Sequence, residues 1–258
     1  MRRESSRRRS TRRRHTVGLA LVALAVGLGT AGCLGSGSNN ASSTDAVTTA
    51  AASTEAATTT APATRTVRIY LVKDGKLVAE GRQLPATEAV GHAALRALLG
   101  DAVFDLSIAN GVATVDGLGA VSHERAAEIV ATLTQFPTVQ AVELDGKRLT
   151  RLEIEDVTPS ILVESPLPEA RVAAPLRITG TANTFEASLI IEVLDADGTT
   201  LTRKIVTATS GSGTRGTFDT EIGFDTAGEQ AGTLYAYEAS AEDGSPIHQV
   251  RIPLTLLP

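Results

Sequence analysis

The segment at residues 217–224 reads Thr-Phe-Asp-Thr-Glu-Ile-Gly-Phe, and it decides the fold of the second half of the chain. Every second residue from Phe218 to Phe224 is apolar or threonine. Successive side chains of a strand point to opposite sides, so these four share one face, while Asp219 and Glu221 occupy the other. The alternation predicts a half-buried β-strand whose apolar face packs against a second layer.

Six further short apolar stretches lie around this segment, with turn residues between most of them. The seven predicted strands cover residues 161–164, 176–181, 188–194, 200–207, 217–224, 233–240 and 250–256. Seven short strands with frequent turns predict a β-sandwich. The chain has one cysteine and no Trp, so aliphatic residues and Phe must hold the sheets together. Tyr235 or Tyr237 is a candidate member of that core.

The part of the chain from residue 66 to about 157 mixes strand and helix patterns. Asp74-Gly75 and Asn110-Gly111 are turn dipeptides typical of hairpins. Two stretches with helical spacing alternate with the strands, and Ser122 is a suitable N-cap for the second. The expected order is β-β-α-β-β-α-β, a compact α+β domain with two helices packed on one sheet.

Four segments of this part resemble the GerMN domain, a family named for sporulation and spore germination proteins. They read IYLVKDGKLV (69–78), NGVATVD (110–116), TLTQFPTV (132–139) and LDGK (144–147). The family's usual loop after the first helix is cut here to Gly100-Asp101-Ala102. Whether this shortening removes a family interface stays open.

The second half resembles the immunoglobulin-like Gmad2 domain, which often follows GerMN. The matching segments read VESP (163–166), PLRITGTA (175–182), FEA (185–187), VLDADG (193–198), RGTF (215–218) and EASAEDGS (238–245). The two resemblances together imply an α+β GerMN-like domain followed by an all-β immunoglobulin-like sandwich. They imply a germination-associated type of protein without a defined catalytic activity.

Residues 1–32 have the order of a secretory signal: arginine clusters, an apolar run, and a small-residue end. The apolar run is shorter than the roughly 20 residues that span a bilayer, so a permanent span is not expected. Ala31, Gly32 and Cys33 resemble a lipobox, although Thr30 stands where that pattern prefers Leu or Val. We predict lipidation of Cys33. The alternative is ordinary signal cleavage with Cys33 as a free thiol, and Sec and twin-arginine export both stay open.

The predicted organisation has four parts. They are a lipoprotein signal peptide (1–32), the lipidated Cys33 with a disordered Ala/Ser/Thr linker (33–65), a GerMN-like domain (66–157) and a Gmad2 domain (158–258). Two acyl chains give stable anchoring. We therefore expect the protein on the extracytoplasmic face of the cell membrane, held through the lipid on Cys33.

The charge distribution argues against nucleic acid as a partner. Eight arginines and one acid fall within residues 1–32, which leaves 16 basic and 28 acidic residues in the remainder. A net charge of −12 repels phosphate backbones.

Few residues are candidates for a catalytic, metal-binding or phosphate-binding site. His92, His123 and His248 are far apart and lack metal-ligand spacing. Residues 195–198 are better explained as a turn than as a calcium loop, and the glycine-rich residues 210–216 as a flexible loop than as a phosphate loop. We expect no catalytic residue, no metal site and no cofactor.

Three functions remain at this point. The first is a non-enzymatic interaction or assembly component of the cell envelope, in which helix faces or sheet edges contact an envelope protein or a second copy. The second is a binding module for cell-wall glycan or a small ligand. The third is an accessory wall hydrolase.

Overall fold

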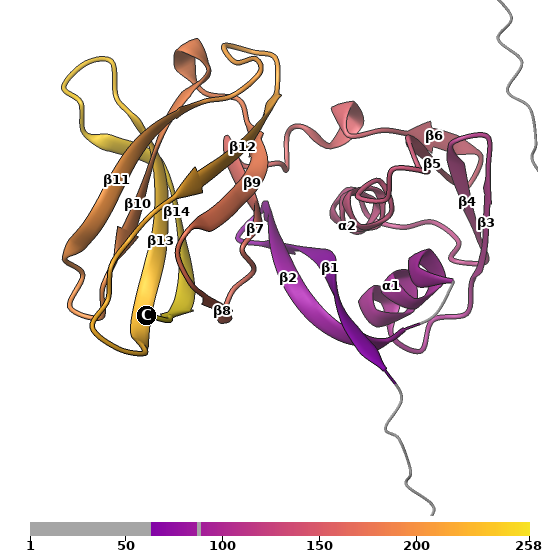
Figure 1. Ribbon diagram of the computed structural model, residues 1–258. Helices are drawn as coiled ribbons and strands as arrows, with labels where there is room; N and C mark the ends of the chain where they lie inside the picture. Colours follow the sequence, from indigo (N-terminus) through magenta and orange to yellow (C-terminus); the bar gives the residue numbers. More distant parts are fainter. Residues whose placement is uncertain (1–62, 87–88) are drawn as a thin grey trace, which may run out of the picture. The chain divides into compact units, whose positions relative to one another are not determined.

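The computed structural model describes residues 63–86 and 89–258, which lie in the compact unit Thr58–Pro258 (Figure 1). The predicted signal peptide, Cys33 and nearly all of the predicted linker lie outside the described residues. Among the helices that the structure describes, none has both the length and the apolar character needed to cross a membrane.

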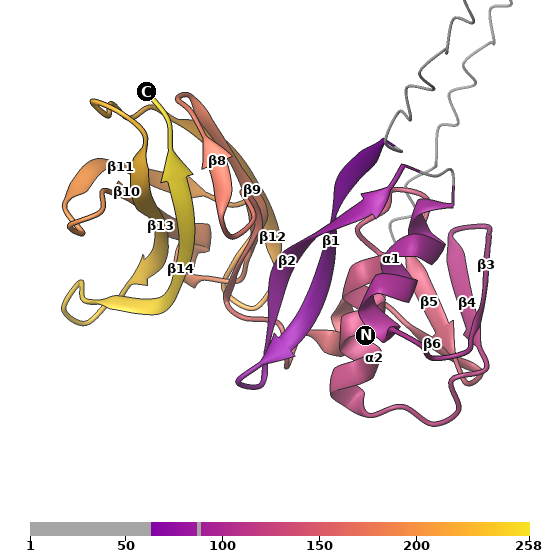
Figure 2. The same ribbon diagram turned by 90° about the horizontal axis from the view of Figure 1, so that it is seen from below.

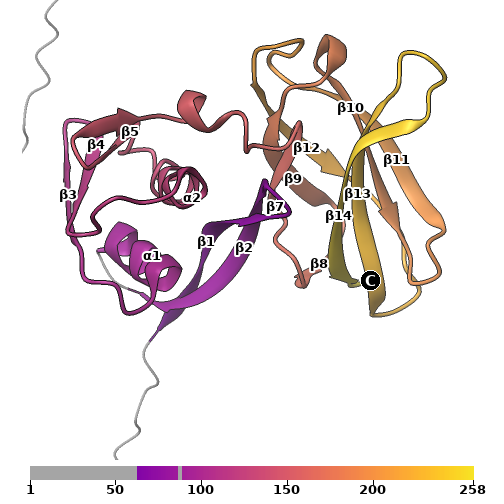
Figure 3. The same cartoon turned by 180° about the vertical axis from the view of Figure 1, so that it is seen from behind.

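The first half of the described chain contains a hairpin, two helices and a second sheet. In Figures 1 and 3 the helices lie between the hairpin β1-β2 and the sheet β3-β4-β5-β6. The elements are β1 (Thr64–Lys73), β2 (Lys76–Pro85), α1 (Val90–Leu99), β3 (Asp105–Ala109), β4 (Val112–Asp116), α2 (His123–Leu133), β5 (Ala141–Leu144), β6 (Lys147–Leu149) and the short 3-10 helix η1 (Leu152–Ile154).

Local sequence signals predicted these turns and helix ends correctly. Asp74 and Asn110 have φ angles of 51° and 49°, and each is followed by a glycine with positive φ, as two-residue hairpins with this twist require. The Ser122 side chain accepts a hydrogen bond from the backbone N–H of Arg125 and caps α2. Gly100, with a φ of 63°, ends α1.

The prediction of one sheet was wrong, because the strands form a two-stranded and a four-stranded sheet. Side chains of α2 occupy the outer edge of β1, where a further strand would otherwise pair. Thr132 Oγ1 accepts from the backbone N–H of Tyr70 at 3.0 Å, and Glu128 Oε1 accepts from that of Val72 at 2.8 Å. The buried backbone donors of β1 are thus satisfied without a strand. The sequence also missed β6, a three-residue strand after the turn that follows β5.

Helix α2 is more deeply buried than its amphipathic pattern suggests. All of its residues from Ala126 to Leu133 are buried, including Glu128 and Thr132. Its polar residues Glu128 and Thr132 bind the edge of β1, and its exposed residues are confined to the first turn, so most of α2 does not present the free helix face that we expected as an interaction surface.

The second half of the described chain is a β-sandwich with eight strands rather than the seven predicted, and Figure 2 shows its two layers. One sheet has the order β11-β10-β13-β14-β8 and the other the order β12-β9-β7. The strands are β7 (Ile161–Ser165), β8 (Ala170–Val172), β9 (Leu176–Ala182), β10 (Ser188–Leu194), β11 (Thr200–Thr207), β12 (Gly216–Ile222), β13 (Gln230–Ala239) and β14 (Pro246–Leu256), with the 3-10 helix η2 (Phe185–Ala187) before β10. The strand that the sequence missed, β8, has three residues and pairs parallel with the end of β14.

Phe218, Ile222 and Phe224 are buried in the core between the two sheets, as their alternation predicted. The tyrosines are not part of that core. Tyr235 and Tyr237 form a separate cluster with Ile190 and Leu194. Strand alternation explains the correction: Leu234 and Ala236 of β13 point into the core, so the two tyrosines between and beside them face outward.

Candidate binding groove

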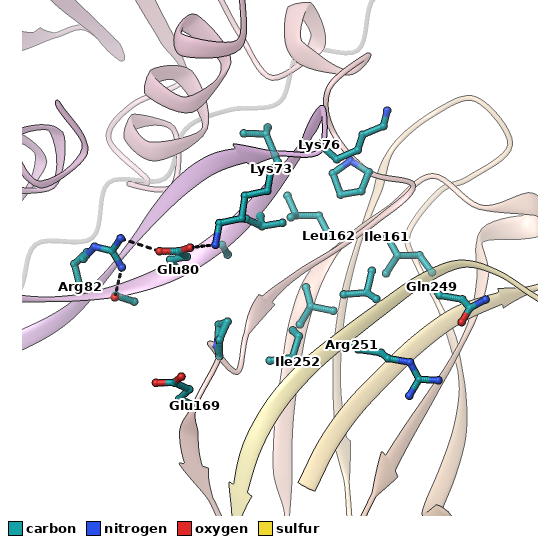
Figure 4. Close-up of a pocket in the computed structure, with 18 residues that line it drawn as sticks. Lys73, Lys76, Glu80, Arg82, Ile161, Leu162, Glu169, Gln249, Arg251 and Ile252 are labelled. Atoms are coloured by element: carbon teal, nitrogen blue, oxygen red, sulfur yellow. Dashed lines mark hydrogen bonds and ion pairs between the residues drawn. The ribbon is translucent and has the colours of Figure 1, made fainter. Parts of the chain in front are cut away.

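A groove of about 730 Å³ is lined by the hairpin β1-β2, by strand β7 and by strand β14 (Figure 4). Lys73, Glu80 and Arg82 lie on the hairpin side, and Gln249 and Arg251 lie on the β14 side. A volume of this size is within the range of sites that bind small molecules or short peptide segments. The groove is the candidate site of this molecule, and its walls, charges and strand edges decide what it can bind.

The apolar wall between these sides comes from β7, whose alternate residues serve two cores. Ile161 and Val163 are buried in the core of the sandwich. Leu162, between them, is buried in the core of the first half. One strand is therefore shared by both hydrophobic cores, and it fixes the wall of the groove to each of them.

The next residue of β7, Glu164, joins the two halves through polar contacts. Its Oε1 accepts a hydrogen bond from the Tyr70 hydroxyl at 2.8 Å, and its backbone carbonyl accepts one from Arg68 Nη1 at 2.8 Å. Arg151 Nη1 lies 3.3 Å from the same carboxylate oxygen. Burial, and after it the charge of Glu164, raises the pKa of Tyr70 to about 12. The phenol therefore stays protonated and donates to Glu164 at any physiological pH.

A second junction lies at the segment after η1. Arg215 donates to the Glu155 carboxylate through Nε at 2.8 Å and Nη2 at 3.0 Å, and Asn183 Nδ2 donates to it at 3.1 Å. Burial opposes ionisation of Glu155, but these hydrogen bonds and the positive charge of Arg215 outweigh it and lower the pKa of the carboxyl. A bidentate arginine pair of this kind fixes geometry as well as charge.

The groove is locally basic although the protein outside its first 32 residues is acidic. Its lining contains four basic and two acidic side chains, which gives a net charge of +2. Glu80 is paired with Lys73 and with Arg82 Nη2, the latter at 2.8 Å, and the hydrogen bond from Lys73 is the first cause of its lowered pKa. The other acid, Glu169, is exposed.

Lys76 and Arg251 carry the positive charges that no carboxylate within salt-bridge distance neutralises in the described part of the chain. Lys76 Nζ donates to the backbone carbonyl of Asp156 at 2.7 Å. The Arg251 guanidinium lies over the Tyr235 ring, 3.9 Å from its centroid. The Tyr235 hydroxyl donates to Gln249 Oε1 at 2.8 Å, so this outward-facing tyrosine orients two groove residues.

The two edges of the hairpin differ. Helix α2 and the residue Gln135 after it bind the outer edge of β1. The backbone N–H groups of Tyr70 and Val72 donate to the helix, as described above. In a third bond, Gln135 Nε2 donates to the backbone carbonyl of Arg68 at 2.8 Å. Three outward backbone groups of β1, the N–H groups of Tyr70 and Val72 and the carbonyl of Arg68, are thus paired.

The edge of β2 faces the groove and is paired only in part. The Gly81 carbonyl accepts a hydrogen bond from Arg82 Nη1 at 3.2 Å, and Ala79 is only 7% exposed. The backbone N–H of Leu77 donates to the carbonyl of Val157 at 2.9 Å, so it points away from β1. Strand alternation directs the backbone groups of Ala79 and Gly81 to the same side. Only β1 pairs with β2 as a strand in the part of the chain that the structure describes.

The histidines that the sequence singled out lie apart, each with its own neighbour. His92 packs against Phe104, with ring centroids 5.1 Å apart. His123 Nε2 lies 2.9 Å from an oxygen of Asp156, and His248 Nδ1 lies 2.8 Å from Glu238 Oε2. In the described ranges no group of three or more His, Cys, Asp or Glu residues could hold a metal ion.

The two loops considered from sequence have structural explanations. Asp195 Oδ1 accepts from the backbone N–H groups of Asp197 and Thr199, which confirms the turn between β10 and β11. The glycine-rich loop differs from the flexible loop predicted. A Cβ at Gly211 would lie 2.5 Å from the backbone of Ala187, so glycine is needed there for close packing.

Comparison with known families gives one match. Residues 160–245 match the family model Gmad2, described as the immunoglobulin-like domain of bacterial spore germination. The match covers the sandwich up to the turn before β14, and the first half of the described chain lies outside it.

Comparison with individual proteins adds little. No curated protein matches the sequence. Among solved structures, CopC from Methylosinus trichosporium OB3b is similar at 16% identity, over 38% of this chain and 94% of that one, with a TM-score of 0.26. A similarity at this level says nothing about the function of this protein.

The groove extends beyond the Gmad2 match. Ile161, Leu162 and Glu169 lie inside the matched residues, while the hairpin side and the β14 side, with Arg251, lie outside them. Sequence analysis missed the groove because its charged residues are far apart along the chain, at positions 73–82, 169 and 251. The only signal in the sequence was the lysine at each side of the Asp74-Gly75 turn.

Proposed function

We propose that this chain is a lipid-anchored, non-enzymatic interaction protein of the cell envelope, of the germination-associated type, and that it holds a protein partner in the groove. The observation that carries the proposal is the combination of the β2 edge, along which no further strand pairs in the described part of the chain, with two cations, Lys76 and Arg251, that have no carboxylate partner among the described residues. Such a surface offers both backbone pairing and charge attraction to another chain.

Two further observations support this role. The Gmad2 match concerns a non-catalytic immunoglobulin-like domain associated with spore germination. The lipobox-like Ala31-Gly32-Cys33 would hold the domains outside the membrane, where envelope proteins are within reach. The anchor and the location are parts of the proposal.

The glycan-binding alternative has less support. Aromatic platforms for sugars present an exposed ring face, whereas Tyr235 and Tyr237 are only 7% and 6% exposed. Phe185 of η2 is 59% exposed but does not line the groove. A wall hydrolase would show clearing of peptidoglycan in a zymogram of the purified chain.

In-cell photocrosslinking tests the proposal. A photoreactive amino acid replaces Glu169, which is exposed and lines the groove, and in a control replaces Arg148, which is exposed on β6. We expect the Glu169 position, and not Arg148, to form an adduct with a second envelope protein, identified by mass spectrometry. Identical adducts, or none, from both positions would overturn the proposal.

A further inference from the structure

We propose that the groove binds an extended acidic peptide segment, which pairs with the open edge of β2 as an added strand and places carboxylates near Arg251 and Lys76. This inference rests on the proposed function and names the chemistry of the partner segment.

The open edge selects an extended occupant. Outward-pointing backbone groups recur at every second residue of β2. After the bonded Leu77, both groups of Ala79 and the N–H of Gly81 are unpaired among the described residues, while the Gly81 carbonyl accepts from Arg82. An extended chain matches this spacing of about 6.6–6.8 Å with its own alternate N–H and C=O groups. A folded surface or a sugar ring does not present that repeat.

The edges of β1 and β2 differ in how their backbone groups are hydrogen-bonded. The donors of Tyr70 and Val72 on β1 are bonded to helix side chains, whereas the N–H groups of Ala79 and Gly81 on β2 have no hydrogen-bond partner among the described residues. Exposed edges invite pairing with foreign chains, and proteins usually cover or charge them. The charged hairpin residues that line the groove are Lys73, Lys76, Arg82 and Glu80, with a net positive charge, so they repel basic strands and attract acidic ones.

The residues that line the groove indicate which side chains the bound peptide segment should have. Its accessible apolar surface comes from the partly exposed Val78, Pro159 and Val250, while Lys76 and Arg251 supply charge. A strand with alternating apolar and acidic residues places one set on each face. Its apolar face would meet Val78, Pro159 and Val250, and its carboxylates would reach the cations. Arg251 can bind a carboxylate through two parallel hydrogen bonds.

The test uses the purified full-length chain and short labelled peptides. The probe is a fluorescein-labelled heptapeptide of alternating glutamate and valine, and its binding is followed by fluorescence anisotropy. One control peptide has lysine in place of glutamate. A second keeps every glutamate but carries N-methyl groups on the alternate amides that would pair with β2.

We expect the acidic peptide to bind and the lysine peptide not to bind. Because a lost hydrogen bond costs about 1 kcal/mol, N-methylation should weaken binding about fivefold or more. Arg251→Gln and Lys76→Gln should each weaken binding of the acidic peptide, whereas the matched surface variant Arg148→Gln should not. Equal binding of the N-methylated peptide would overturn strand pairing, and equal binding by Arg251→Gln and Lys76→Gln would overturn the charge argument.

The peptide-binding test and the crosslinking test can fail independently of each other. A Glu169 adduct in cells combined with no peptide binding would overturn the inference and leave the proposed function standing. Peptide binding combined with no envelope adduct would overturn the proposed function. If the adduct proves to be a second copy of this chain, the crosslinked segment must be an acidic extended strand of that copy for the inference to hold.

Discussion

The Tyr70 hydroxyl in β1 donates a 2.8 Å hydrogen bond to the Glu164 carboxylate in β7, and this pair ties the hairpin to the sandwich. Arg68 and Arg151 surround the same glutamate, so its charge is compensated from the first half of the described chain. The groove depends on this attachment, because the hairpin forms one of its sides.

Tyr70→Phe tests the attachment. Removing the donor should lower the free energy of unfolding by about 1–2 kcal/mol at neutral pH, since Glu164 keeps its two arginines. The wild-type pKa is raised from 10.0 to about 12, so the contribution of the neutral phenol is present below pH 10 and is lost as the pH rises toward 12. Each pKa unit corresponds to about 1.4 kcal/mol, so this loss should reach roughly 2–3 kcal/mol. Urea unfolding at pH 9 and pH 11.5 should show the alkaline loss in wild type and a smaller one in Tyr70→Phe. An equal loss in both proteins would contradict the account.

Leu162→Ala tests whether β7 couples the two cores. Leu162 is 3% exposed and belongs to the core of the first half, although its strand is part of the sandwich. Truncation of a buried leucine costs about 2–5 kcal/mol. We expect wild type to unfold in one calorimetric transition and Leu162→Ala to lose the first half at a lower temperature. The control Val163→Ala should destabilise the sandwich instead. Two independent transitions in wild type would show that the halves are not coupled.

Glu155→Gln tests the second junction through pH. The folded pKa of Glu155 lies below its ordinary value of 4.5, so its contribution to stability is present above pH 4.5 and is lost as the pH falls through the folded value. Because the pair is partly solvated, the variant should lose only about 1 kcal/mol at pH 7. The difference in stability between wild type and variant should shrink below pH 4. A difference that stays constant from pH 7 to pH 3 would assign the effect to packing alone.

Cys33→Ser tests the anchor. If a thioether-linked diacylglyceryl group holds the protein, wild type should sediment with membranes and incorporate labelled palmitate, and the variant should do neither. Two acyl chains give effectively stable anchoring, so the shift should be nearly complete. An unlabelled wild-type protein released into the medium would rule the anchor out.

The sequence predicted features that depend on local chemistry. The turns at Asp74 and Asn110 and the cap at Ser122 were correct, because a left-handed dipeptide or a capping hydroxyl acts on its immediate neighbours. The alternation from Phe218 to Phe224 correctly predicted a strand with a buried face.

Features that depend on distant contacts were missed. Glu128 and Thr132 look like solvent-facing positions of an amphipathic helix, yet they cap the edge of β1. Tyr235 has the aromatic character of a core residue, but the register of β13 turns it outward under Arg251. The groove combines a hairpin near one end of the described chain with a strand near the other. No periodicity in the sequence links them.

The measurement that tests the central claim most directly is residue-resolved hydrogen exchange of the β2 edge by NMR. In the free full-length chain, the amides of Ala79 and Gly81 should exchange much faster than those of Tyr70 and Val72, which are bonded to Thr132 and Glu128. Addition of the acidic peptide should protect Ala79 and Gly81 and leave Tyr70 and Val72 unchanged. If Ala79 and Gly81 are already protected in the free chain, or stay unprotected when the peptide is bound, the open edge of β2 is not the docking site.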